Sequence, residues 1–212
     1  KVIYNAIETE LFTPWGSQPY RDRWLSGKDH FIVGQVGRLT PWKGQELLLS
    51  VARYAQHEHL PLKFVVIGDD SFGLPGYSHK LQAMARQFEV EDKIIFTGWL
   101  EDMPGVMRSL DALVHPSLSP EPFGLVIAEA MACARPVVVA NHGGAREVVG
   151  SCDYGILFPP GDASACLSAI RQLFINPCEA QRMGLRARKR IESNFSFSRF
   201  VEEFAALYSS LA

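Results

Sequence analysis

The feature that most constrains the fold is a series of short apolar runs without polar alternation, each followed by a segment of helical pattern. The runs lie at 31–36, 62–67, 93–96, 112–115, 137–140 and 155–158. A strand that is apolar throughout is buried on both faces of its sheet. Parallel strands need a crossover between them, and a helix usually supplies it. The sequence therefore predicts a parallel sheet of the α/β class, covered on both faces, with 155–158 as an edge strand.

Segments of helical pattern lie between the predicted strands and fill the end of the chain. They are expected at 44–56, 79–88, 103–109, 123–133, 145–149, 163–174, 179–193 and 198–211. Residues 1–30 hold Pro14, Gly16, Pro19 and Gly27 and are expected to be irregular. We predict a Rossmann-like doubly wound parallel sheet with C-terminal helices. Its domain would span 31–193, with a linker at 1–30 and a separate helix at 194–212.

Composition excludes several classes of protein. The formal net charge of -2 gives no electrostatic footprint for nucleic acid, so no nucleic-acid partner is expected. No apolar run reaches the 18 residues of a membrane span. The four cysteines form no C-x-x-C pair, which favours free thiols in a reducing compartment, here the cytoplasm. The basic run at 186–190 is expected to be a solvated helix face, with peripheral contact to the cytoplasmic membrane face as the alternative.

The stretch from Ser119 to Glu129 follows the predicted strand at 112–115 and leads into a helix of small residues. Glu121 lies in the turn, and Glu129 lies inside the helix among apolar neighbours. A carboxylate in apolar surroundings is costly without a partner, which favours a functional role over an exposed helix position. Backbone amides near Phe123, Gly124 and Leu125 would form the first turn and attract an anion such as phosphate. The pattern suits a ligand that carries both phosphate and hydroxyl groups.

A second strand-to-helix turn, Gly37 to Gly44, carries two cations, Arg38 and Lys43. Cations at a helix N-terminus oppose its dipole, so an anion is expected to compensate them. Arginine can bind phosphate with two parallel hydrogen bonds, and lysine adds a mobile point charge. Both side chains could therefore converge on one diphosphate. Because ligands of doubly wound folds bind at the carboxyl ends of the strands, both turns would face the same crevice.

Motifs for other nucleotide sites are missing from the sequence. No G-x-x-x-x-G-K-S/T occurs, which argues against a P-loop, and Gly34 and Gly37 lack the G-x-G-x-x-G spacing of a dehydrogenase. No D-x-D occurs, so a metal-bound diphosphate is not expected. We therefore expect no metal and no cofactor.

Together these residues resemble glycosyltransferase family 4, whose members have the GT-B architecture of two Rossmann-like domains. Glu121 and Glu129 match its E-x7-E signature within P-S-x-x-x-E-P-F-G-x-x-x-x-E-A-M-A, and 37–44 matches G-R-L-x-x-x-K-G. The resemblance covers most of 31–150. Val2 to Glu8 resembles the start of the second domain in that family, although Ala6 and Glu8 depart from the pattern. Because no initiator Met or signal peptide begins the sequence, we expect the chain to be cut from a longer protein.

The resemblance implies the donor-binding, carboxyl-terminal domain of a retaining hexosyltransferase of polysaccharide biosynthesis. Arg38 and Lys43 would bind the diphosphate and stabilise its leaving charge. Glu121 would accept hydrogen bonds from the donor sugar, with catalytic roles for Glu121, Arg38 and Lys43. Glu129 would accept from the ribose. The donor would be a nucleoside diphosphate sugar, UDP ahead of GDP, and the loop with Trp99 and Leu100 would line the base pocket.

The acceptor, a glycan or a lipid-linked glycan, would bind through an amino-terminal domain outside this chain. The final helix would pack across to that domain, and the chain alone is expected to be inactive in transfer. Two alternatives stay open: a GT-B sugar-nucleotide epimerase, which acceptor-dependent turnover would exclude, and a non-catalytic module that binds nucleotide sugars. Fold alone does not decide among them.

Overall fold

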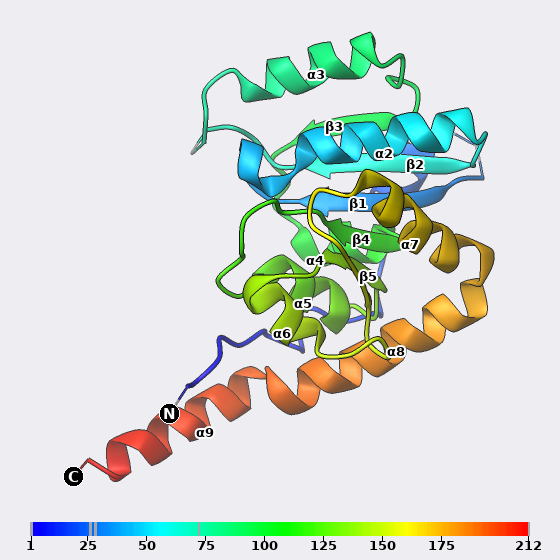
Figure 1. The fold of residues 1–212 in the computed structure, drawn as a ribbon. Helices are drawn as coiled ribbons and strands as arrows, with labels where there is room; N and C mark the ends of the chain where they lie inside the picture. The colour runs from blue at the N-terminus through cyan, green and yellow to red at the C-terminus, as the bar shows by residue number, and fades with distance from the viewer. Residues whose placement is uncertain (1, 26, 28, 72, 212) are drawn as a thin grey trace.

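The computed structural model describes residues 2–25, 27, 29–71 and 73–211, and it contains one parallel sheet between two layers of helices (Figure 1). The strands are β1 (Phe31–Val36), β2 (Leu62–Ile67), β3 (Ile94–Gly98), β4 (Ala112–His115), β5 (Val137–Ala140) and β6 (Ile156–Phe158). The sheet order is β3-β2-β1-β4-β5-β6, and neighbouring strands pair in parallel. This order reverses between β1 and β4, where doubly wound folds bind their ligands. The predicted fold class is confirmed.

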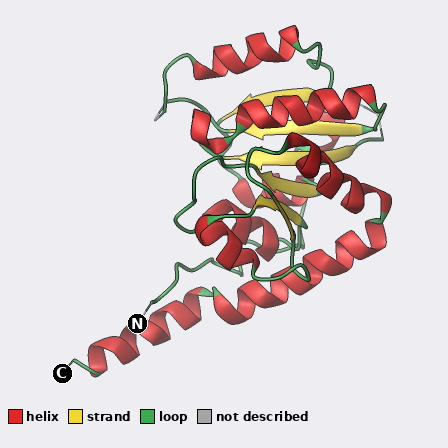
Figure 2. Ribbon diagram, viewed as in Figure 1, coloured by secondary structure: helices red, strands yellow, loops and turns green. Residues whose placement is uncertain are grey.

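The helices of the described residues are α1 (Arg21–Leu25), α2 (Gln45–His57), α3 (Tyr77–Gln87), α4 (Met103–Ser109), α5 (Leu125–Ala132), α6 (Gly143–Val149), α7 (Ala163–Ile175), α8 (Pro177–Asn194) and α9 (Phe197–Ser209). A 3-10 turn, Pro41–Lys43, precedes α2. One apolar core lies between the sheet and α2, α3 and α7, and a second lies between the sheet and α4, α5 and α6 (Figure 2). None of these helices, within the described ranges, is long and apolar enough to cross a membrane.

The amino-terminal segment is more ordered than predicted. Helix α1 lies within the stretch that was expected to be irregular. It is held in place by Trp24, whose side chain is buried in the second core and stacks on Tyr20 at 5.4 Å between ring centroids. Ile7 is also buried in that core, and its amide donates to the Phe195 carbonyl at 2.8 Å. Much of the predicted linker therefore packs as part of this domain.

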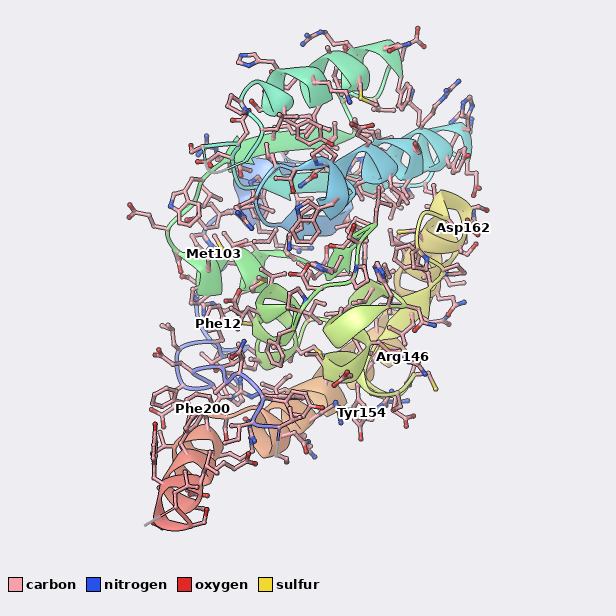
Figure 3. The ribbon with its side chains drawn as sticks, turned by 60° about the vertical axis from the view of Figure 1, so that its left-hand side comes forward. Phe12, Met103, Arg146, Tyr154, Asp162 and Phe200 are labelled. Atoms are coloured by element: carbon pink, nitrogen blue, oxygen red, sulfur yellow. The ribbon has the colours of Figure 1, made fainter. Side chains whose placement is uncertain are left out.

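Helix α9 projects away from the sheet layers, next to the N-terminal end of the chain (Figures 1 and 3). None of its residues is buried. Its aromatic side chains form a row along the helix, in which Phe200 lies 6.2 Å from Phe197 and 4.7 Å from Phe204 between ring centroids. The row presents an apolar surface to solvent.

The basic run of α8 is not the solvated face that the sequence suggests. The Arg188 side chain, 11% exposed, donates to the carbonyls of Ala132, Phe12 and Thr9. Arg190 donates to the carbonyls of Val148 and Glu147, at 2.9 Å each. The carbonyls of Ala132, Glu147 and Val148 belong to the last turns of α5 and α6. Carbonyls in a last turn lack helical partners and carry the negative end of the helix dipole. Arg186 also donates to the Asp153 carbonyl, at 3.0 Å. Three of the four basic residues in the run therefore bind backbone carbonyls elsewhere in the fold.

Candidate functional site

Two loops meet where the sheet order reverses: the loop after β1, which leads into α2, and the loop after β4, which leads into α5. The Leu118 amide donates to the Trp42 carbonyl at 2.7 Å and joins the two backbones. Gly44 lies at φ 76°, and a Cβ built there would be 2.1 Å from the Pro116 carbonyl oxygen. A glycine tolerates both the left-handed conformation and this close approach. The two loops therefore form one surface at the carboxyl edge of the sheet.

Two buried glutamines hold the backbone of the loop after β1. Gln35 donates its side-chain amide to the Lys43 carbonyl at 2.7 Å, and Gln45 donates to the Arg38 carbonyl at 2.9 Å. Each bond fixes the backbone at one of the two cations that the sequence singles out. The loop thus presents Arg38 and Lys43 from a backbone that is held at both positions.

Lys43 and Glu121 form an ion pair across the two loops. The Lys43 ammonium lies 2.8 Å from Glu121 Oε2 and 3.0 Å from Oε1, and both side chains are mostly buried. The sequence predicts an anion near the cationic turn, and at Lys43 this anion is the Glu121 carboxylate. A phosphate at this position would have to share the ammonium with Glu121.

The Glu121 carboxylate has a second set of contacts, to residues at the end of β4 and in the turn that follows it. His115 Nε2 lies 3.2 Å from Glu121 Oε2, and Ser117 Oγ lies 3.4 Å from the same oxygen. Burial alone would raise the pKa of Glu121, but the hydrogen bonds from His115 and Lys43 outweigh it and lower the pKa to about 2. Glu121 is therefore ionised at neutral pH.

A cavity of about 280 Å³ opens at the carboxyl ends of β1, β2 and β3. Most of its wall is apolar and comes from Val36, Ile67, Leu100, Met103 and Val126. The Trp99 ring, 69% exposed, stands at its wall, and its charged residues are Arg38, Asp69 and Glu129. The structure thus brings four predicted residues, Arg38, Trp99, Leu100 and Glu129, to one pocket.

Glu129 differs from Glu121 in its surroundings. Its carboxyl group makes no hydrogen bond or ion pair with the part of the chain that the structure describes, and burial raises its pKa to about 7. An unpartnered carboxyl at the wall of an apolar pocket is costly to ionise unless a ligand donates to it. Its position favours a ligand with hydroxyl donors.

A second cavity, of about 290 Å³, adjoins the first, since Val126 lines both. Its lining includes the predicted residues Lys43, Glu121, Phe123, Gly124 and Leu125, together with Asn5 and Pro122. Gly124, at φ 95°, is the N-cap, so α5 begins at Leu125, two residues later than predicted. The amides of the first helical turn, at Leu125 and Val126, therefore lie at the second cavity.

Several residues of the site were missed by sequence reasoning. His115 ends the predicted strand at 112–115 and Ser117 lies in the matched motif, and neither was given a role, yet both are buried against Glu121. Asp69 follows β2 in the same way that Arg38 follows β1, and this position after a strand is a signal that could have identified it. Among the described residues there is no group of three or more His, Cys, Asp or Glu side chains that could hold a metal ion.

Comparison with known proteins shows the family to which a chain with this site belongs. The family model of the glycosyl transferases group 1 matches residues 17–190. The lipopolysaccharide core biosynthesis mannosyltransferase LpcC of Rhizobium leguminosarum bv. viciae is 29% identical over 210 residues, which cover 99% of this chain and 59% of that protein.

Two solved structures are similar over the whole fold. HepE of Anabaena, in complex with UDP-glucose, has a TM-score of 0.90 and 30% identity, and the match covers 99% of this chain and 57% of that one. The sucrose-phosphate synthase of Thermosynechococcus elongatus has a TM-score of 0.87 and 27% identity over 100% of this chain and 52% of its own. The chain spans little more than half the length of the curated relatives it matches. With the family model covering most of its length, the chain belongs to the glycosyl transferases group 1.

Proposed function

We propose that the chain is the donor-binding, carboxyl-terminal half of a retaining GT-B hexosyltransferase of glycosyltransferase family 4. The single observation that carries this proposal is the pair of adjoining cavities at the reversal of the sheet order. One cavity is apolar and holds an unpartnered carboxyl, and the other holds a lysine, a glutamate and a helix start. A nucleoside diphosphate sugar carries, in order, a planar base, a ribose, two phosphates and a hydroxyl-rich sugar. The apolar wall suits the base, the unpartnered carboxyl suits the ribose, the lysine and the helix start suit the phosphates, and the glutamate suits the sugar.

The first cavity would receive the nucleoside. Its apolar wall and the Trp99 ring offer a surface for a base, and Leu100 lines the same wall. Glu129 would accept hydrogen bonds from the two ribose hydroxyls, which would supply the partners that its carboxyl otherwise lacks. UDP is preferred over GDP in this proposal because HepE, which is 30% identical, was crystallised with UDP-glucose.

The second cavity would receive the phosphates and the sugar. Arg38 and Lys43 would approach the diphosphate from the loop after β1, and the amides near Phe123, Gly124 and Leu125 from the start of α5. These positive groups would stabilise the charge that develops on the leaving diphosphate. Glu121, held ionised, would accept hydrogen bonds from hydroxyls of the donor sugar. The family's metal-independent transfer would follow, because the cations and amides of this chain neutralise the leaving group.

Acceptor binding would belong to a second domain, and the row of aromatic rings on α9 is a suitable surface for packing against it. We expect the 212-residue chain to bind the donor but not to transfer sugar, because GT-B catalysis takes place between two domains. The cysteines are unpaired in the structure, which supports our assignment of the chain to the cytoplasm.

The experiment that tests the proposal is calorimetry of the chain with UDP, GDP, ADP and their sugars, with and without EDTA. We expect the strongest binding with UDP or a UDP-sugar and no loss in EDTA. A transfer assay with glycan acceptors, followed by mass spectrometry, tests the division of labour. Binding to none of the nucleotides would contradict the proposed function, and acceptor-dependent turnover by the chain alone would contradict the need for a second domain.

A further inference from the structure

Two buried polar side chains at the site, His115 and Ser117, have no role in the function proposed above. Their residues are 2% and 1% exposed, and both belong to the end of β4 and the turn that follows it. His115 Nε2 lies 3.0 Å from Ser117 Oγ, and each of these atoms is also close to Glu121 Oε2, at 3.2 and 3.4 Å. The three atoms form a closed triangle at the same Glu121 oxygen, Oε2, that Lys43 contacts at 2.8 Å.

The triangle determines which ring nitrogen of His115 carries a proton. An ionised carboxylate can only accept hydrogen bonds, so the Nε2 atom that faces it must be protonated. The Ser117 hydroxyl can then accept from Nε2–H and donate its own proton to Glu121. Burial lowers the pKa of His115, which favours the neutral ring with this single proton. Glu121 thus has donors other than Lys43.

The backbone around Ser117 is also fixed. His142 Nε2 lies 2.8 Å from the Ser117 carbonyl oxygen, which can only accept, so His142 is the donor. The Gly144 amide donates to the Glu121 carbonyl at 2.7 Å, so α6 holds the same turn at a second point. The turn that carries Glu121 is therefore supported by β4 on one side and by the start of α6 on the other.

The two sets of donors to Glu121 would respond differently to a bound diphosphate. Lys43 is at the second cavity and is one of the cations expected to approach a phosphate. Any shift of its ammonium toward a phosphate weakens its bond to Glu121. His115 and Ser117 are buried beneath the turn and would keep their contacts. An ionised carboxylate that lost all its donors would take up a proton or rotate.

We propose that His115 and Ser117 are positioning residues that keep Glu121 ionised and directed at the donor sugar while Lys43 is engaged by the diphosphate. This inference rests on the proposed function. It predicts that loss of His115 weakens the binding of the sugar part of the donor and leaves the binding of the nucleoside diphosphate part unchanged.

The first test compares UDP with UDP-glucose by calorimetry. His115→Leu removes the donor but keeps an apolar volume in a buried position. We expect it to weaken UDP-glucose binding roughly three- to tenfold, with UDP binding within about twofold of the parent chain. His115→Gln places an amide N–H near the position of Nε2 and should restore most of the loss. The control His57→Leu, at the end of α2, should change neither ligand.

A double-mutant cycle then asks whether His115 acts through Glu121. Glu121→Gln alone should show the same selectivity for the sugar-bearing ligand. Adding His115→Leu to Glu121→Gln should cause no further loss, because the interaction being tested is already absent. Equal weakening of UDP and UDP-glucose by His115→Leu, or additive losses in the cycle, would overturn the inference while leaving the proposed function intact.

NMR on the unmodified chain tests the inference without ligands or variants. The ¹⁵N shifts of His115 should identify the tautomer with the proton on Nε2 at neutral pH, and an unprotonated Nε2 would refute it. In Ser117→Ala or His115→Leu the pKa of the Glu121 carboxyl, from ¹³C titration, should move up toward its usual range. If the parent chain binds neither UDP nor UDP-glucose, the proposed function fails, and these measurements still decide whether His115 holds Glu121.

Discussion

Lys43 and Glu121, which are 78 residues apart in the sequence, form an ion pair in which one ammonium contacts both carboxylate oxygens. The pair connects the loop after β1 with the loop after β4 at the point where the sheet order reverses. The two turns were predicted to face one crevice, but the direct contact between Lys43 and Glu121 was not predicted from the sequence. In this position Lys43 can exchange one anionic partner, Glu121, for another without leaving the crevice.

Removal of either cation should weaken nucleoside diphosphate binding. We expect Arg38→Ala or Lys43→Ala to cost roughly 1.5–3 kcal/mol of binding free energy, as for a hydrogen bond to a charged group. Calorimetry with UDP measures the effect, and Lys80→Ala, a more exposed lysine that pairs with Glu46, is the control. Unchanged affinity in both site variants would exclude the assigned roles.

Glu129 should discriminate ribose from deoxyribose. If its carboxylate accepts from both hydroxyls, 2′-deoxy-UDP should bind the parent chain less tightly than UDP by about 1–2 kcal/mol. Glu129→Gln should reduce this difference, because the two changes remove the same interaction. Equal affinities of UDP and 2′-deoxy-UDP for the parent chain would show that Glu129 has a structural role instead.

The same residue should make stability depend on pH. Burial raises the pKa of Glu129 from 4.5 to about 7, so ionisation is less favourable in the folded chain than in the unfolded one. The free energy of unfolding therefore loses a contribution as the pH rises from 4.5 through 7. Glu129→Gln should stabilise the chain at pH 8 by roughly 1–3 kcal/mol and have little effect at pH 4.

Urea unfolding across this pH range measures the difference. Glu91→Gln, at an exposed position, serves as the matched control and should show no such pH-dependent gain. A Glu129→Gln variant that is no more stable than the parent at pH 8 would mean that the carboxyl is not destabilised by its pocket.

Gly44 should not tolerate a side chain. Gly44→Ala combines the strain of a left-handed conformation, about 1 kcal/mol, with the contact at 2.1 Å to the Pro116 carbonyl. Gly76→Ala is a matched control, because Gly76 has φ 82° with nothing within 4 Å of the added Cβ and also precedes a helix. We expect the Gly44 variant to lose at least about 2 kcal/mol more than the control in thermal unfolding. Similar losses would show that the loops can separate at little cost.

The sequence predicts the sheet well, because its strands are buried on both faces and leave a clear apolar signal. The bounds of β1, β2, β4 and β5 agree with those predicted. Helix α1 was missed because its five residues are too few for a periodic pattern, and its burial depends on Trp24 reaching a distant core. The start of α5 was misplaced because the left-handed conformation of Gly124 ends the turn.

The site is less completely predictable than the fold. Residue type and local sequence surroundings are enough to select Arg38, Lys43, Glu121 and Glu129 as candidates, since these are local properties. The pairing of Lys43 with Glu121 depends on the order of strands in the sheet, which no local pattern specifies. For the same reason the contrast between an ionised Glu121 and a Glu129 that titrates near neutral pH arises only from the tertiary surroundings.

Arg188 gives α5 a mechanical connection to the beginning of the chain. Its guanidinium binds the Ala132 carbonyl at the end of α5 and also the carbonyls of Thr9 and Phe12. A reorientation of residues 9–12 must therefore either break a hydrogen bond or pull on the helix that carries Glu129. Helix α5 has eight residues and is about 12 Å long, so its last turn lies close to its first. We therefore expect movement of residues 9–12 to be coupled, through Arg188, to the position of the start of α5.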